Sequence, residues 1–554
     1  MTKICVKNAN TMCDAALAAS SNLGWRVVLK EKSADILMHS QATANALVVD
    51  ITTIKPNQKV SKIPGSSHVA KKHVLADVFS RASKIINDSE DSNSYIEEFW
   101  PKTYSLPADL DEVRSELNKN KKRKKKRTLI LKPSDGSQGE GISLLQTPSD
   151  LKACMVTRSS NAKSVVQEYL PAPLLLPAEP FKFDLRIYVL VRSVEPLEIY
   201  LCKEGLVRFA TSAYEKPQRS NLSDVMKHLT NYSLNKRSGE YIHNDGKTSG
   251  GSGGEEDEDL EVVADVVLPE DDPHEEVGSK RTLTSLLKTL QRTHPDFDKE
   301  DFFQNLVNLS MATVKAMQPS LVSSTKSLSG DDEKAERMLS GQCFQIYGLD
   351  VLVDERYRTW LLEVNGNPSM RLDHEVCNTG GSGSEEGRAL DHYVPSIVDE
   401  CVKGIVMKEA LKIVDEGFEG AAEHYIDVSG TSTISEGLEC LDIIGDVTAH
   451  YAATFSRGRG GEDNRNKLTL SLFRRVLAKF REEKGGIGVR GMNSLGADTD
   501  LAYQRWDLDR RKKKGDDFDV WCDLWDFYDA LVVIAKLVGV VGRNDYEKLS
   551  ALLK

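Results

Sequence analysis

The segment 350–369, which reads DVLVDERYRTWLLEVNGNPS, constrains the fold of this chain more than any other stretch. Two β-rich runs flank a charged turn at residues 354–358, and this order predicts a β-hairpin. Because side chains alternate along a strand, Glu363 and Asn365 share one face of the second strand. A turn centred within residues 354–358 places Asp350 roughly opposite Glu363.

The expected pairing of Asp350 with Glu363 has a consequence for charge. Carboxylates that face each other across two strands repel, and a stable fold tolerates them better with a cation between them. Asp, Glu and Asn supply only oxygen ligands, which suits Mg²⁺ held by protein on one side and by phosphates on the other. From this segment alone, an ordinary hairpin with a solvated acidic face is an equally good interpretation.

Length and composition narrow the class of protein. The 554 residues, 40% hydrophobic and 28% charged, are typical of a soluble globular protein with several domains. The nine cysteines form no CxxC pair, which argues against a zinc site or a disulfide framework. We expect no signal peptide and no membrane segment, and the net charge of −11 argues against a general nucleic-acid binder. Charge is uneven, however, because residues 121–127 are all basic and residues 255–261 are almost wholly acidic.

The order of patterns along the chain predicts an α/β (α+β) architecture rather than a barrel or a bundle. Strands are expected at 25–29, 46–51, 128–132, 164–169, 181–192 and 197–202, and helices at 71–86, 282–291, 301–318 and 393–415. Two stretches, 236–279 and 378–387, have the Gly-, Ser- and Glu-rich composition of surface insertions. The domains that we expect are 1–110, 111–235, 236–280, 281–424 and 425–554.

The last of these expected domains has a different character. Residues 468–483 and 521–538 show helical apolar spacing. The acidic residues between them, at 498–509, suggest an EF-hand, but the calcium-loop pattern is absent. We therefore expect a small helical module without a tight calcium site.

Residues 132–142, KPSDGSQGEGI, form a glycine-rich segment after an expected strand. Gly136, Gly139 and Gly141 would let the backbone approach a polyphosphate closely and donate N–H groups to its oxygens, while Lys132 would add positive charge. The segment is not a Walker A sequence, because no Gly-Lys-Ser/Thr closes it. Glycine-rich turns after strands are common, so this motif alone also has a purely structural interpretation.

The strand at 182–186, KFDLR, carries three ionisable side chains on one face. Lys182, Asp184 and Arg186 alternate with apolar residues. Such a face is costly to bury without partners, so it is either solvated or lines a cleft with charged ligands. In a cleft, the Lys would contact phosphate and the Arg would bind a carboxylate.

Two further motifs are less specific on their own. Residues 165–170 form an apolar strand whose end, with Gln167, is a plausible edge for reading adenine, although the same pattern fits a core strand. Residues 228–233, HLTNYS, are compact and polar, and on sequence alone they fit a simple turn.

Together and in this order, the motifs resemble those of the tubulin–tyrosine ligase-like family of ATP-grasp ligases. The resemblance spans about residues 1–420, and one departure is Ser61, where the family usually has Asn. The matching pieces are KIPG at 62–65, FWPKT at 99–103, LKP at 131–133, QGEGI at 138–142, VQEYL at 166–170, KFDLR at 182–186, HLTNYS at 228–233, LEVNGNPS at 362–369, and Asp399 with Lys403 on the helix that closes the domain.

The resemblance implies a reaction in which ATP phosphorylates an acceptor carboxylate and the amine of an amino acid attacks the acyl phosphate to form an amide. It implies ATP and Mg²⁺ as cofactors, with Asp350, Glu363 and Asn365 as the magnesium ligands. Arg208 matches the arginine that holds the incoming amino acid, and Arg186 would support the reacting carboxylates. The family's ATP positions fall on Lys132, Gln138, Gly139, Gln167, Glu168, Tyr169, Leu170, Lys182, Asp184, Thr230 and Asn231. The residues matching those that read glutamate in glutamylating members are Tyr232, Ser233 and Lys280, and Lys72 matches a phosphate contact.

Chain length and the C-terminal extension make the chain most similar to the tubulin polyglutamylases. The resemblance thus implies L-glutamate and the acidic tails of tubulin as substrates of a monomer with no nucleic-acid or membrane partner. It implies a location in the cytoplasm and cytoskeleton, including the axoneme of a cilium or flagellum and the basal body. The basic segment 121–127 either attracts those tails, is a solvated loop, or is a nuclear-localisation patch. Four alternatives stay open: a glycylase, a tyrosine ligase, an ATP-grasp ligase for another acidic protein, and a non-catalytic microtubule-binding protein.

Overall fold

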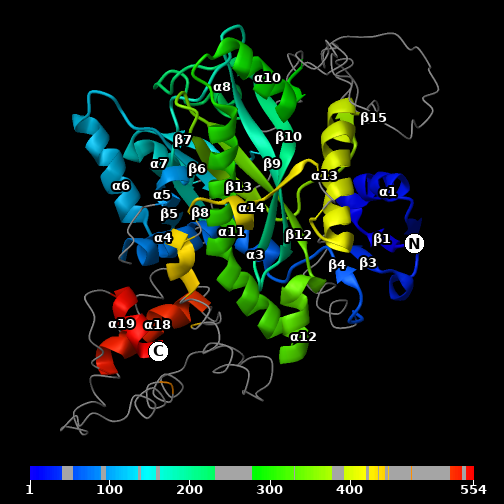
Figure 1. Cartoon of the computed structure of the whole chain (residues 1–554). Coiled ribbons are helices and arrows are strands. Elements are labelled where there is room, and N and C mark those ends of the chain that lie inside the picture. The colour runs from blue at the N-terminus through cyan, green and yellow to red at the C-terminus, as the bar shows by residue number, and fades with distance from the viewer. Residues whose placement is uncertain are drawn as a thin grey trace, which may run out of the picture.

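The chain forms a mixed α/β fold in which several sheets are surrounded by helices (Figure 1). The computed structural model describes residues 1–39, 54–88, 95–134, 139–156, 162–230, 278–329, 331–376, 392–419, 423–434, 436–442, 447, 476, 524–538 and 545–553. Five predicted segments lie wholly or almost wholly outside these residues, namely 46–51, 236–279, 378–387, 468–483 and 498–509. No helix in the described part of the chain is both long enough and apolar enough to cross a bilayer.

The N-terminal residues form a parallel sheet with the strand order β2-β1-β3-β4. Helix α1 (Cys13–Asn22) buries Ala15, Ala16 and Ala19 in a hydrophobic cluster that also contains Val402. The strands are β1 (Lys3–Asn8), β2 (Arg26–Val27), β3 (Ile36–His39) and β4 (Lys59–Val60).

A second, antiparallel sheet has the order β5-β8-β6-β7 and confirms the strands predicted near 128–132 and 164–169. Its strands are β5 (Thr103–Leu106), β6 (Leu129–Pro133), β7 (Ser143–Leu145) and β8 (Ser164–Glu168). Helices α6 (Leu110–Lys119) and α7 (Pro148–Val156) contribute to its hydrophobic cluster. We call this the small sheet, and it brings Lys132 and Gln167 onto neighbouring strands.

The largest sheet has the order β11-β10-β9-β12-β13, with β16 added to β10. The predicted hairpin is confirmed, because Asp350 pairs directly with Glu363. The strand predicted at 197–202 is longer than expected and continues to Ala213. The strands of this large sheet are β9 (Phe181–Ser193), β10 (Glu198–Ala213), β11 (Lys280–Thr282), β12 (Gln345–Val353), β13 (Thr359–Asn365) and β16 (Tyr425–Asp427).

Helices cover both faces of the large sheet, and the alternation along β9 separates them. Leu185 and Ile187 pack in a cluster with α10 (Leu283–Thr293) and α11 (Lys299–Ser329), whereas Tyr188 and Leu190 pack in a cluster with α13 (Ile397–Glu416). The helix predicted at 393–415 begins later than expected, because β15 (His392–Pro395) pairs with β14 (Asp373–Val376).

Helix α4 (Lys72–Asp88) confirms the helix predicted at 71–86 and supports the C-terminal helices. Phe79 of α4 and Phe527 of α18 (Leu524–Val538) belong to one buried cluster. Ion pairs join Arg81 to Asp529 at 2.9 Å and Lys84 to Asp545, the first residue of α19 (Asp545–Leu553), at 3.2 Å. Helix α18 confirms the helix predicted at 521–538, and α18 and α19 both contribute to the main hydrophobic core (Figure 1, red helices).

Candidate active site

A cleft with an empty volume of about 620 Å³ lies between the small sheet and the large sheet. Most of its lining consists of residues that the sequence singled out. The lining residues are Ile130, Lys132, Ile142, Gln167, Glu168, Tyr169, Leu170, Lys182, Asp184, His228, Leu229, Thr230, Asp350, Leu352, Leu362 and Glu363. Lys182 and Asp184 on the charged face of β9 are therefore buried in the lining of a cleft rather than solvated, whereas Arg186 is not part of that lining.

Two lysines in the cleft are buried beside neutral acceptors. Lys132 Nζ donates to Gln167 Oε1 at 2.7 Å and to the carbonyl oxygen of Leu362 at 3.3 Å. Lys182 Nζ donates to the carbonyl oxygen of His228 at 2.9 Å and lies 4.5 Å from the centre of the Tyr169 ring. Burial lowers the pKa of Lys132 to about 8 and that of Lys182 to about 7. Both amines are therefore poised to gain from an added negative charge.

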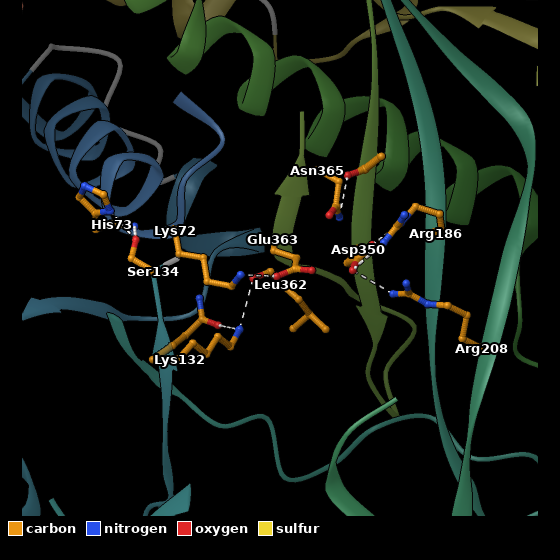
Figure 2. Close-up of polar contacts among 12 residues, drawn as sticks. Lys72, His73, Lys132, Ser134, Arg186, Arg208, Asp350, Leu362, Glu363 and Asn365 are labelled. Atoms are coloured by element: carbon orange, nitrogen blue, oxygen red, sulfur yellow. Dashed lines mark hydrogen bonds and ion pairs between the residues drawn. The ribbon is translucent and has the colours of Figure 1, made fainter. Parts of the chain in front are cut away.

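Two arginines in the same region are paired with buried carboxylates. Arg186 Nε donates to Asp350 Oδ1 at 2.5 Å, and Arg208 lies 2.9 Å from Asp350 (Figure 2). Arg208 also lies 2.6 Å from Asp184. Although burial alone would raise it, Arg186 and Arg208 hold the pKa of Asp350 well below its usual range. Burial raises the pKa of the Asp184 carboxyl against the lowering effect of Arg208. The large sheet thus carries a compact network of two arginines and two carboxylates.

The second carboxylate of the hairpin, Glu363, contacts a cation from another element. Lys72 Nζ at the start of α4 lies 3.1 Å from Glu363 Oε2, and Figure 2 shows Glu363 between Lys72 and Asp350. The solvated-acidic-face interpretation of the hairpin is wrong for Asp350, which is 3% exposed. In the structure, Lys72 neutralises Glu363, and Arg186 and Arg208 neutralise Asp350. These contacts do not test the predicted magnesium ion between the two carboxylates.

The donor set of the hairpin fits a hard cation. Asp350 lies opposite Glu363, and Asn365 lies opposite Gly348, to whose carbonyl oxygen its amide donates at 3.4 Å. Their carboxylate and amide oxygens are the ligands that Mg²⁺ prefers. No cluster of three or more His, Cys, Asp or Glu side chains arranged for a metal occurs among the described residues, so a site here would rely on Asn365 and on oxygens from outside the protein.

Lys280 lies beside this network but is held by another carboxylate. In the pairing of β11 with β10, Lys280 is opposite Arg208. Its Nζ lies 2.5 Å from Asp399 Oδ2, and Lys403 Nζ lies 2.7 Å from Asp399 Oδ1. Against the raising effect of burial, these two ammonium groups hold the pKa of Asp399 well below its usual range. Its position near Arg208 agrees with the predicted amino-acid site, and its role there stays a prediction.

Several predicted residues do not line the cleft or cannot be placed. Gly139 and Gly141 of the glycine-rich segment adopt φ values of 82° and 68°, which favour glycine. Gln138, Asn231, Tyr232 and Ser233 lie outside the described residues.

Sequence reasoning missed a bulge in the hairpin that shapes the cleft. Asp350 pairs with Glu363 but Val351 pairs with Leu361, so Leu362 is an extra residue in β13. Such a bulge re-aims side chains, and as a result the neighbours Leu362 and Glu363 both line the cleft. Simple alternation put Leu362 on the opposite face from Glu363, and the sequence carries no glycine there that would have signalled the bulge.

Other missed lining residues are apolar or come from loops. Ile130, Ile142, Leu352 and Leu229 supply the apolar surface on which a flat ring can pack. His228 was noted only as part of a compact motif, yet its carbonyl oxygen accepts from Lys182 and its ring contacts Tyr169 edge-on. The Ile and Leu residues gave no signal, since apolar strand residues are ordinary core residues in any sequence.

Comparison with known proteins gives the chain relatives over most of its length. The model of the tubulin-tyrosine ligase family matches residues 52–260 and 266–379. Tubulin polyglutamylase TTLL11 of Mus musculus is 32% identical over 76% of this chain and 50% of its own length. Tubulin polyglutamylase TTLL11 of Homo sapiens is 35% identical over 64% of this chain and 43% of its own length. Tubulin polyglutamylase TTLL6 of Homo sapiens is 30% identical over 65% of this chain and 33% of its own length. The chain therefore spans half or less of the length of these relatives.

Proposed function

This chain belongs to the tubulin-tyrosine ligase family, and on that premise we propose that it is an ATP-dependent ligase that adds glutamate to the acidic C-terminal tails of tubulin. The observation that carries the proposal is the cleft itself, whose lining includes two buried lysines and the paired Asp350 and Glu363, with two arginines bound to Asp350. That its named relatives are tubulin polyglutamylases supports the choice of amino acid and substrate.

ATP occupies the cleft in this proposal, within an ATP-grasp arrangement of the two sheets. The cleft combines apolar walls with a few convergent polar groups, as small-molecule sites do. Lys132 and Lys182 take the phosphates, because each is a buried cation whose described contacts are neutral acceptors. The apolar residues and the strand end at 167–170 take the adenine, with Gln138, Gly139, Thr230 and Asn231 completing the nucleotide contacts.

Magnesium is held by Asp350, Glu363 and Asn365. When bound, it neutralises phosphate charge and orients the phosphates for transfer. Lys72 and the two arginines keep the carboxylates in place between turnovers, since each carboxylate has a protein cation within reach.

The reaction joins two carboxylate-bearing partners, so it crowds negative charge. An acceptor carboxylate oxygen attacks the γ-phosphorus of ATP, ADP leaves, and an acyl phosphate forms. The amine of glutamate then attacks the acyl carbon, an amide forms, and phosphate leaves. Arg186 and Arg208 orient the carboxylates of acceptor and amino acid, while Tyr232, Ser233 and Lys280 read the side chain of glutamate.

Recruitment of the tail uses the basic segment 121–127. All of its residues except the half-buried Arg123 are exposed. An exposed cationic segment attracts an acidic, extended peptide and does so less at high salt. A cytoskeletal location and action as a monomer complete the proposal.

The decisive test removes one carboxylate of the hairpin. With ATP, Mg²⁺, tubulin and labelled glutamate, Glu363→Ala is expected to lower incorporation at least about a hundredfold, because it removes a ligand to the catalytic cation. The matched control is Glu355→Ala, an exposed glutamate in the turn of the same hairpin, which should retain activity. Mass spectrometry of the tubulin tails measures both.

The outcomes separate the parts of the proposal. Retained ligation by Glu363→Ala would overturn the metal assignment. No mass added to tubulin by the unaltered protein would overturn the substrate, and addition of glycine or tyrosine in parallel reactions would replace glutamate as the donor.

A further inference from the structure

His228 lines the cleft, and both nitrogens of its ring have polar partners. Nε2 lies 3.1 Å from the carbonyl oxygen of Asn221, and Nδ1 lies 3.2 Å from the hydroxyl oxygen of Tyr169. His228 is the last residue of the short helix α8 (Val225–His228), and it is 1% exposed. The reaction proposed above gives this buried ring no role.

The two partners fix the protonation state of the ring. A carbonyl oxygen can only accept, so Nε2 carries the proton and donates it to Asn221. Nδ1 then keeps a free lone pair, and the Tyr169 hydroxyl donates to it. Burial lowers the pKa of His228, which keeps the ring neutral near pH 7. The charged groups that act on the ring are Lys182, Lys227 and Asp224.

The same ring controls both acceptors of the buried amine on β9. Lys182 Nζ donates to the Tyr169 hydroxyl oxygen at 3.3 Å and to the carbonyl oxygen of His228 at 2.9 Å. The first acceptor is oriented by Nδ1, and the second belongs to the residue whose ring is anchored on Asn221. His228 thus holds Lys182 through its ring and through its backbone.

This arrangement leaves the amine ready for a ligand. The Lys182 ammonium has three N–H donors, and the two oxygens occupy two of them. Among the residues that the structure describes, it has no third hydrogen-bond acceptor, so one N–H remains for a ligand. An amine that is fixed before the ligand arrives loses less conformational freedom on binding, which raises the affinity.

The charged form of the amine depends on these two neutral oxygens. Asp184 on the same strand raises the pKa of Lys182, and Lys132 on β6 lowers it, while burial has the largest effect. Since Asp184 compensates burial only in part, loss of one oriented acceptor should lower the pKa of Lys182 further.

We propose that His228 is a positioning residue, which orients the Tyr169 hydroxyl and its own carbonyl oxygen so that the Lys182 amine is held ready for a phosphate of the nucleotide. The inference rests on the proposed function for the identity of the ligand. The ring acts through Tyr169 and Lys182, and it requires no contact with the nucleotide.

The test measures binding of a non-hydrolysable ATP analogue with Mg²⁺ by calorimetry on the full chain at pH 6 and pH 8. His228→Ala is expected to weaken binding about five- to tenfold at pH 8, the effect of one lost hydrogen bond on the charged amine. At pH 6 the loss should be only about twofold, because much of the amine stays charged in both proteins. His228→Asn should restore most of the affinity, since its Oδ1 takes the position of Nδ1 and accepts from the Tyr169 hydroxyl.

Tyr169→Phe is the second arm, because it removes the hydroxyl between the ring and the amine and keeps the shape of the side chain. It should show the same dependence on pH, and the double variant should bind no worse than His228→Ala. The matched control is Tyr214→Phe. Its phenol lies near Tyr169, but its hydroxyl donates to the carbonyl oxygen of Pro171 at 2.9 Å, so the variant should bind as the unaltered protein does.

The outcomes separate positioning from a merely structural role. Equal losses at pH 6 and pH 8 would overturn the inference, because a structural defect does not depend on the charge of the amine. Unchanged binding by His228→Ala, equal loss with Asn and Ala, or a loss by Tyr214→Phe as large as that by Tyr169→Phe would also overturn it. No binding by the unaltered protein would instead overturn the proposed function, and thus the two failures are distinguishable.

Discussion

Two sets of cations, the buried lysines and the partly buried arginines, differ in their partners. Lys132 and Lys182 donate to amide, carbonyl and hydroxyl oxygens, whereas Arg186 and Arg208 donate to the carboxylates of Asp350 and other residues. Burial lowers the pKa of both lysines, while the pKa of both arginines is raised because their carboxylate partners outweigh burial.

The difference indicates that the lysines and the arginines have different functions in the site. Asp184 and Glu363 raise the pKa of Lys182 and Lys132 only in part against burial, so each amine stays incompletely compensated and an anionic ligand relieves the remaining cost. A cation that is already compensated gains less from a new anion, but it fixes the geometry of its partner. The lysines are thus suited to take phosphate, and the arginines fix the carboxylates of the hairpin in addition to the substrate-orienting role proposed above. Three changes sharpen this comparison.

The largest effect is expected from Arg208→Ala. It leaves Asp184 and Asp350 buried without one of their cations, so the free energy of unfolding should fall by about 3–5 kcal/mol. Urea unfolding followed by circular dichroism measures it. The matched control is Arg358→Ala, whose guanidinium pairs with Asp354 but is 55% exposed, and which should change stability by less than about 1 kcal/mol. Equal effects of the two variants would contradict the compensating role of Arg208.

The arginine–carboxylate network also shows which contacts could be predicted from the sequence and which could not. Alternation along single strands was enough to place Lys182 and Asp184 on one face and to pair Asp350 with Glu363, since the period of a strand is two. The partners of Asp350 come from β9 and β10, and their order in the sheet depends on long-range packing. No local pattern encodes that order.

The same limit applies to the contacts of α4 and to the bulge at Leu362. Lys72 and Glu363 are far apart in the chain, and only the folded core brings them within 3.1 Å. Lys72 was noted through the family resemblance alone. Helical spacing predicted α4 itself, because its buried side chains recur at helical intervals.

A smaller effect on stability, with a clear effect on binding, is expected from Lys182→Met. The variant loses hydrogen bonds to His228 and Tyr169 but no longer buries an amine, so its free energy of unfolding should stay within about 1 kcal/mol of the unaltered protein. The affinity for an ATP analogue should fall about tenfold to a hundredfold, because a hydrogen bond to a charged group is worth roughly 1.5–3 kcal/mol. Lys216→Met, at an exposed position, is the control. A loss of stability as large as that of Arg208→Ala would show that the two sets of cations do not differ.

The smallest effect is a dependence of ATP binding on pH. Burial lowers the pKa of Lys182 to about 7, so the amine is charged below that pH and increasingly neutral above it. Phosphate favours the charged form, and the protein must therefore take up a proton to bind ATP at higher pH. Titration of Lys182 should lower the affinity by up to about tenfold per pH unit between roughly pH 7 and 9, with no slope from this group below that range. Lys132, whose pKa burial lowers to about 8, adds its own slope above that pH. Calorimetry in buffers of different ionisation enthalpy counts the protons directly.

Lys182→Met should bind with less proton uptake at pH values near 8, because one titrating amine is gone. Equal proton uptake by the two proteins would mean that Lys182 does not contact the phosphates. Of the two lysines, only Lys132 would then differ from the arginines by binding phosphate.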